Sequence, residues 1–260
     1  MAERFREKWS REETILAFDL YCKTSFSKIS KTNKDIIALA ELLGRTPSSV
    51  GLKMANLAHY DPELIARNVK GMSNTSKLDK EIVEEFNGDW EKLSYQAQIL
   101  RAKYAHTDIQ TLNPEAFEDA MPDGMDVQKE MKIRLGQYFF RLSVLNAYGN
   151  SCCITGIQCP GLLIASHIKP WSVSDSKTER TNPRNGLCLN SLHDKAFDKG
   201  LITIDKNYRV IFSPHLTDVY MDESTHDWFY KYEKKEIQLP DKFLPGKDFI
   251  EYHNDMVFQQ

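Results

Sequence analysis

The feature that most constrains the fold of this chain is a change in hydrophobic spacing near residue 150. Before Gly149, apolar residues recur every three to four positions, which is the spacing of amphipathic helices. After it, the apolar runs are short and β-like, and they cover 152–157, 162–168, 201–204 and 208–212. The last two runs flank a polar turn and indicate a hairpin. We therefore expect an α+β chain, with helices first and a smaller domain containing β-strands after them.

The N-terminal helices contain two neighbours joined by a short turn. Ser10 and Glu13 have the spacing of a capping box, which predicts a helix start. Further along, Gly44 ends one helix, and Thr46 followed by Pro47 starts the next. This order is typical of helix-turn-helix regions, whose second helix enters the DNA major groove. A helical hairpin that only packs is the alternative. The DNA contacts expected from the second helix are Ser48, Ser49, Lys53 and Asn56.

Turn signals and spacing divide the chain into three segments. Residues 1–70 are the expected helix-turn-helix-like domain, and a polar stretch from Gly71 to Ser76 follows as a linker. Residues 71–126 show helical spacing without visible chemistry, and we interpret them as a helical spacer that could support a dimer interface. Residues 127–260 are the expected third domain with a C-terminal extension, and they open with an apolar helix that ends near Gly149.

The overall charge of the chain does not favour a nucleic-acid partner. The formal net charge is −3 and the isoelectric point is about 6.2. The local balance differs, because residues 1–60 carry ten Lys or Arg against seven Asp or Glu, and residues 151–200 carry six against four. The global value therefore does not exclude DNA, since it averages over segments with different charge.

The sequence also bears on the cellular compartment and the state of the cysteines. The charged N-terminus has no apolar signal core, and no apolar run approaches the roughly 18–20 residues that span a bilayer. The five cysteines are an odd count, so we expect reduced thiols and a cytoplasmic protein without membrane contact. Four of them fall within residues 152–188, which makes a structural zinc site the alternative to buried apolar cysteines.

Side chains with catalytic chemistry gather after residue 160. His167 ends an apolar strand, Asn185 follows in a loop, and a short helix then carries His193, Asp194 and Asp198. Imidazole, amide and carboxylate groups from one strand, one loop and one helix can converge on a single metal-sized site. The two carboxylates share a helix face, whereas His193 is rotated from Asp194 by about 100°. At most two of these three are therefore expected to bind one ion.

Three short segments, S-H-I-K-P-W, N-P-R-N-G-L-C-L and L-H-D-K-A-F-D-K-G, resemble the HNH nuclease family, whose core is the ββα-metal fold. The resemblance covers about residues 130–212. It includes the segments Q-Y-F-F-R-L-S-V-L-N-A-Y and C-C-I-T-G ahead of these motifs, which are typical of the restriction-endonuclease-like branch. The helices of residues 1–70 are similar to regions that precede nuclease domains in some restriction endonucleases, and loosely to the Myb-like fold.

The resemblance implies a role for each of the polar residues. His167 matches the general base, which would deprotonate a water molecule, and Asn185 matches the residue that holds the loop and orients the base through a hydrogen bond. His193 matches the helix residue that binds a divalent ion. Many members have a second metal ligand immediately before the base, but here Ser166 stands there. Since Mg²⁺ and Mn²⁺ prefer carboxylates, we expect the second ligand to be Asp198, with Asp194 as the alternative.

The resemblance implies a metal-dependent endonuclease that hydrolyses phosphodiester bonds in double-stranded DNA and restricts foreign DNA. Lys169, Arg180 and Arg184 are the phosphate contacts expected near the base. Cutting both strands favours a homodimer, because a dimer supplies two active sites. Two alternatives stay open: a nicking or structure-specific nuclease, and a non-catalytic DNA-binding regulator with a degenerate nuclease core.

Overall fold

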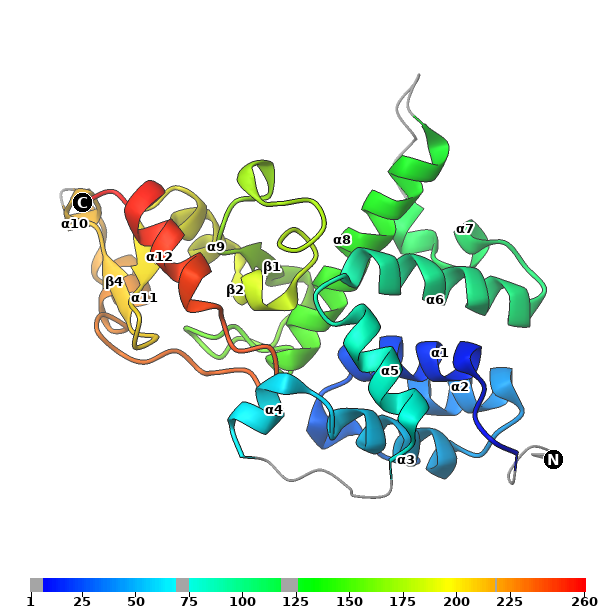
Figure 1. Cartoon of the computed structure of the whole chain (residues 1–260). Coiled ribbons are helices and arrows are strands. Elements are labelled where there is room, and N and C mark those ends of the chain that lie inside the picture. Colours follow the sequence, from blue (N-terminus) through cyan, green and yellow to red (C-terminus); the bar gives the residue numbers. More distant parts are fainter. Residues whose placement is uncertain (1–6, 69–74, 118–125, 218) are drawn as a thin grey trace. The chain divides into compact units, whose positions relative to one another are not determined.

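The computed structural model describes residues 7–68, 75–117, 126–217 and 219–260. The chain forms two compact units, residues 1–143 and 144–260 (Figure 1), and the boundary falls within one long helix. The first unit is helical, and the second combines helices with two short antiparallel strand pairs. The predicted α+β class is confirmed. No helix in the described ranges is long and apolar enough to cross a membrane.

The first unit is built around α1, which is Arg11–Cys22. Every residue of this helix from Glu13 to Cys22 is buried, so α1 is covered on all sides. Helices α2, α3, α5 and α6 contact it. The helices and turns of this unit that follow α1 are η1 Phe26–Lys28, α2 Lys34–Leu43, α3 Pro47–Ala58, α4 Pro62–Ala66, α5 Lys77–Phe86, α6 Trp90–Ala105, α7 Ile109–Leu112, η2 Pro114–Phe117 and most of α8 Val127–Ala147.

The predicted ends of the N-terminal helices are confirmed. Ser10 and Glu13 form a capping box at the start of α1. Gly44 follows α2 with a φ of 64°, in the left-handed region that favours glycine. The Thr46 side chain then accepts a hydrogen bond from the Ser49 N–H at the start of α3, with Pro47 at the first helical position. The chain therefore runs from α2 through a short turn into α3, as expected from its capping residues.

The expectation that Lys53 lies on the exposed face of α3 is wrong. Its ammonium is 2.6 Å from a carboxylate oxygen of Asp79, the third residue of α5, and both side chains are buried. The ring of Trp9 lies 5.1 Å from the same ammonium. Since α5 packs over this side of α3, Lys53 has a partner that its position in α3 alone does not reveal.

Residues 71–126 do not form a separate spacer where the structure describes them. Helices α5 and α6 contact α1, and their apolar residues, among them Ile82, Phe86 and Leu93, are buried. The division into 1–70, 71–126 and 127–260 therefore differs from the two observed units, because the apolar faces of α5 and α6 complete the core around α1. The first four residues of the predicted linker, 71–74, lie outside the described residues.

The second unit begins within α8 and contains a β-strand pair followed by a helix. Strand β1, Leu163–His167, pairs antiparallel with β2, Gly186–Asn190, so that His167 lies opposite Gly186. Helix α9, Ser191–Asp198, follows directly and packs against both strands. The expected hairpin is present as β3, Ile202–Ile204, and β4, Val210–Phe212. The remaining elements are η3 Pro160–Leu162, η4 Trp171–Val173, η5 Pro183–Asn185, α10 Pro214–Thr217, α11 Glu223–Tyr230 and α12 Lys247–Met256.

The C-terminal segment holds the end of α9. The His253 ring on α12 stacks on Phe197 at 3.8 Å, and its Nε2 lies 3.1 Å from the Phe197 carbonyl oxygen. The Gln259 backbone N–H donates to the Gly200 carbonyl at 2.9 Å, and its side-chain amide donates to the Lys199 carbonyl at 2.8 Å. These bonds satisfy carbonyl groups that the end of a helix leaves without partners.

We expect Gly200→Ala to destabilise the second unit more than Gly149→Ala. Both glycines have positive φ, 66° and 64°, which costs about 1–2 kcal/mol for an L-residue. A Cβ at Gly200 would also collide with the Val257 carbonyl, whereas a Cβ at Gly149 would meet no atom within 4 Å. Thermal denaturation of the full chain measures both losses. Equal losses would contradict the close approach of the C-terminal segment to Gly200.

Candidate active site

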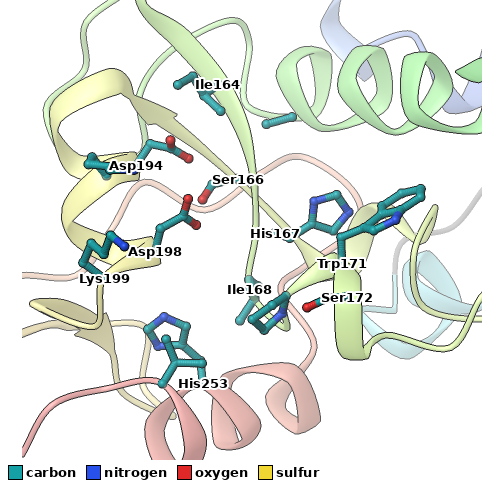
Figure 2. A pocket seen from close by; sticks show the side chains of 14 residues that line it. Ile164, Ser166, His167, Ile168, Trp171, Ser172, Asp194, Asp198, Lys199 and His253 are labelled. Carbon is teal, nitrogen blue, oxygen red and sulfur yellow. The ribbon is translucent and has the colours of Figure 1, made fainter. Parts of the chain in front are cut away.

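A pocket of about 570 Å³ lies in the second unit, among β1, α9 and α12 (Figure 2). Strand β1 contributes Ser166 and His167, and α9 contributes Asp194 and Asp198. Figure 2 shows both carboxylates and the Ser166 hydroxyl directed toward one another, with the His167 ring on the other side of the strand end. The predicted base and two of the three predicted metal ligands therefore line one pocket.

His167 is held in a defined orientation at the end of β1. Its Nε2 lies 2.8 Å from the Arg180 carbonyl oxygen. Because a carbonyl only accepts hydrogen bonds, Nε2 carries the proton and the lone pair of the neutral ring is on Nδ1. Trp171 packs edge-on against the ring at 5.5 Å. Burial lowers the pKa of His167 below its ordinary 6.5, and the bond to the Arg180 carbonyl offsets only part of this effect.

Asn185 is fully buried and holds the loop that follows the base. Its Oδ1 accepts a hydrogen bond from the Lys169 N–H at 2.8 Å, and its Nδ2 donates to the Lys169 carbonyl at 3.1 Å. The same Nδ2 lies 3.4 Å from the carbonyl of Glu179, the residue before Arg180. The predicted loop-holding role thus has a structural basis. These bonds reach the backbone on both sides of the loop, so Asn185 acts on the orientation of His167 through the backbone.

The two carboxylates lie one turn apart on α9, at the positions of Asp194 and Asp198. Burial raises the pKa of Asp194, and burial together with the neighbouring charge of Asp194 raises the pKa of Asp198. The Ser166 hydroxyl opposes the rise at Asp194, although it has no hydrogen bond of regular geometry. Two carboxylates that repel one another, beside a buried hydroxyl without a partner, fit a hard divalent cation, because Mg²⁺ is bound through one or two carboxylates and keeps several waters.

The structure does not bring His193 to this pocket, and its predicted role as a metal ligand beside His167 is corrected. The ring is fully buried, with Nδ1 2.9 Å from the Asn190 amide nitrogen, and it packs against Phe229 at 5.2 Å. Burial lowers its pKa to about 4. The rotation between neighbouring helix positions is the physical reason, since it directs Asp194 into the pocket and His193 into the core. The shared face of the two carboxylates was the sequence signal that predicted their common position in this pocket.

The three predicted phosphate contacts are held by other groups and do not line the pocket. The Lys169 ammonium is 2.6 Å from a Glu179 carboxylate oxygen. The Arg180 Nε donates to the Ser174 carbonyl at 3.1 Å, and its guanidinium lies over the Trp171 ring. Arg184 is exposed, and its Nε donates to the Leu244 carbonyl at 3.3 Å. Contact of these residues with DNA stays a prediction.

The cysteines of the second unit are mostly core residues. Cys152, Cys153 and Cys188 are buried, while Cys159 is exposed. Burial raises the pKa of the Cys153 thiol well above its ordinary value, which opposes the thiolate form that binds zinc. Within the described ranges, no three side chains of His, Cys, Asp or Glu gather in a way that could hold a metal ion. The zinc alternative therefore has no set of ligands in that part of the chain.

Three pocket residues were missed by sequence reasoning. Lys195 on α9 and Lys199 directly after it lie beside the carboxylates, and their spacing of four residues was a visible signal. His253 reaches the pocket from α12, 55 positions after Asp198, and no local pattern links it to the other residues. Its ring contacts Phe197, so it supports the helix that carries the carboxylates.

Two antiparallel strands and a helix, with a histidine at the strand end and carboxylates on the helix, define a small ββα domain. Residues 152–205 match the family model described as HNH endonuclease. The match covers about a fifth of the chain, and it supports a nuclease of the HNH type, which is a hydrolase. The matched residues contain both strands, α9, His167 and the two carboxylates. No curated protein matches the chain.

We expect Asn185→Ala to lower the free energy of unfolding by about 1–3 kcal/mol, because it leaves the Lys169 N–H without its partner and removes one of the two side-chain hydrogen bonds to the Lys169 carbonyl, which keeps the bond from the Ser174 hydroxyl. Amide hydrogen exchange at Lys169 should become faster. Asn182→Ala is the matched control, since that side chain bonds only the Arg184 N–H and the Thr178 carbonyl in a more exposed loop. Urea denaturation and exchange measurements on both variants check this. Equal effects at the two positions would contradict the role of Asn185.

Proposed function

We propose that the protein is a metal-dependent endonuclease that hydrolyses phosphodiester bonds in double-stranded DNA and restricts foreign DNA. The observation that carries this proposal is the shared pocket of His167, Asp194 and Asp198 within the matched domain. A proton acceptor and a pair of carboxylates for a hard cation are the groups that phosphodiester hydrolysis needs. Other HNH nuclease roles, such as nicking, need the same groups and are separated by the test below.

His167 would take the proton of the attacking water at Nδ1. The bond from Nε2–H to the Arg180 carbonyl fixes the ring and stabilises the positive charge that the ring acquires. Asp194 and Asp198, with the Ser166 hydroxyl beside them, would hold Mg²⁺ or Mn²⁺. A divalent ion supplies stabilisation of the negative charge on the phosphate and on the leaving 3′-oxygen.

The first unit would supply DNA binding through α3. Of the contacts predicted there, Ser48 is exposed, while Ser49 and Asn56 are half-buried. Lys53 is excluded from the proposal, because its ammonium is buried against Asp79. The positive local balance of residues 1–60 supports contact with DNA. A homodimer in the cytoplasm, with one active site for each strand, completes the proposal.

We expect the full chain to cut supercoiled plasmid with Mg²⁺ or Mn²⁺ and to lose at least about 100-fold in rate in His167→Ala, since a general base contributes 10²–10⁴-fold. Asp194→Asn and Asp198→Asn should raise the metal concentration needed for half-maximal rate. His193→Gln is the matched control on the same helix. It should leave that concentration unchanged in protein that remains folded.

The products of this digest separate the proposed role from its alternatives. Discrete linear bands support restriction, and open circles alone support a nicking enzyme. Repeating the digest on methylated plasmid shows whether modification changes cutting. Cutting that persists in His167→Ala, or in EDTA, would contradict the mechanism. A complete lack of metal-dependent cutting by the folded chain would instead favour the non-catalytic regulator.

We expect the acid side of the kcat–pH profile at saturating Mn²⁺ to have its midpoint below pH 6.5. General-base catalysis requires neutral His167, and burial lowers the pKa of this ring, so the active form persists to lower pH than for an exposed histidine. The rate should rise with pH through that midpoint and then stay level toward pH 8. A midpoint at or above pH 6.5 would contradict the assignment of His167 as a buried base.

A further inference from the structure

Two lysines, Lys195 on α9 and Lys199 directly after its last residue, lie beside the carboxylates. Lys195 and Lys199 follow Asp194 and Asp198 by one position each, so both pairs have the spacing of one helical turn. Both lysines line the pocket and are exposed, and Figure 2 shows Lys199 beside Asp198. In the part of the chain that the structure describes, neither ammonium forms an ion pair or a hydrogen bond.

The other cations near the base differ in this respect. The Lys169 ammonium is held by Glu179 at 2.6 Å, and the Arg180 guanidinium is held by the Ser174 carbonyl and the Trp171 ring. Binding a phosphate through these side chains would require breaking an existing charge-assisted contact. Lys195 and Lys199 have no direct contact of this kind to break, and their charges act on the Asp198 carboxylate only at longer range. They are also separated by about 6 Å along the helix axis, far enough apart to reach two different phosphates.

We propose that Lys195 and Lys199 bind the DNA backbone on either side of the phosphate to be cut. This inference rests on the proposed nuclease function and names how its substrate is held. A pocket lined by two carboxylates alone would repel a polyanion, whereas the two exposed lysines beside them offset that negative charge. In this arrangement Asp194 and Asp198 face the phosphate to be cut, and Lys195 and Lys199 face the phosphates on either side of it.

The test uses the full chain with His167→Ala, so that DNA is bound without being cut. Binding of a fluorescein-labelled 30-base-pair duplex is measured by anisotropy in Ca²⁺ buffer at several salt concentrations. In the double variant Lys195→Gln/Lys199→Gln, Kd should rise about tenfold or more. The slope of log K against log salt should fall by about 0.9 for each lost contact. Lys206→Gln, in the exposed β3–β4 turn, is the matched control and should leave both values unchanged.

An unchanged Kd and slope in the double variant, or an equal loss in Lys206→Gln, would overturn the proposal. Lys195→Arg/Lys199→Arg should retain affinity, because it preserves charge. If the double glutamine variant is unfolded, as shown by the loss of its thermal transition, the two single variants are measured instead. Each should lower the slope of log K against log salt by about 0.9. With the base restored, lysine loss should raise KM and leave kcat within about twofold. Failure of the nuclease function itself appears separately, as plasmid left uncut by the parent chain.

Discussion

The carboxamide of Asn185 is the interaction on which the geometry of the site depends. Beyond His167, strand β1 leaves its partner, and the chain enters a loop whose backbone groups have no ladder to join. The buried Asn185 side chain bonds the Lys169 N–H and carbonyl as another backbone residue would, so these part-buried groups have hydrogen-bond partners. It also reaches Glu179, next to the carbonyl that fixes the ring of His167. A single side chain thus links the backbone that follows His167 to the backbone beside the Arg180 carbonyl.

The features predicted from sequence were those set by neighbouring residues. The capping box at Ser10, the glycine after α2 and the β3–β4 hairpin depend on contacts within a few positions. The wrong expectations concerned side chains whose partners lie far along the chain. Lys53 meets Asp79 from another helix, and His193 meets Phe229 from α11. The local sequence pattern shows which residues share one face of a helix. It does not show which other helix packs against that face.

The helical unit uses the same carboxylates for two purposes. Glu13 and Asp79 each occupy the third position of a helix and accept the backbone N–H of their own capping serine. Each also pairs with a buried cation, Arg45 or Lys53, and the Trp9 ring lies against both cations. Burial would raise the pKa of Glu13, but its bonds to Arg45 and Ser10 outweigh this and lower it. Such pairs favour one arrangement of helices more than they add stability.

The attachment of the C-terminal segment to the end of α9 has a consequence for the size of the catalytic domain. The family match ends at residue 205, yet the carbonyls of Lys199 and Gly200 find their partners at Gln259. A fragment cut to the matched residues would expose Phe197 and leave the helix that carries Asp198 frayed at its end. In this chain the compact unit that contains the matched segment therefore extends more than fifty residues past the end of that segment.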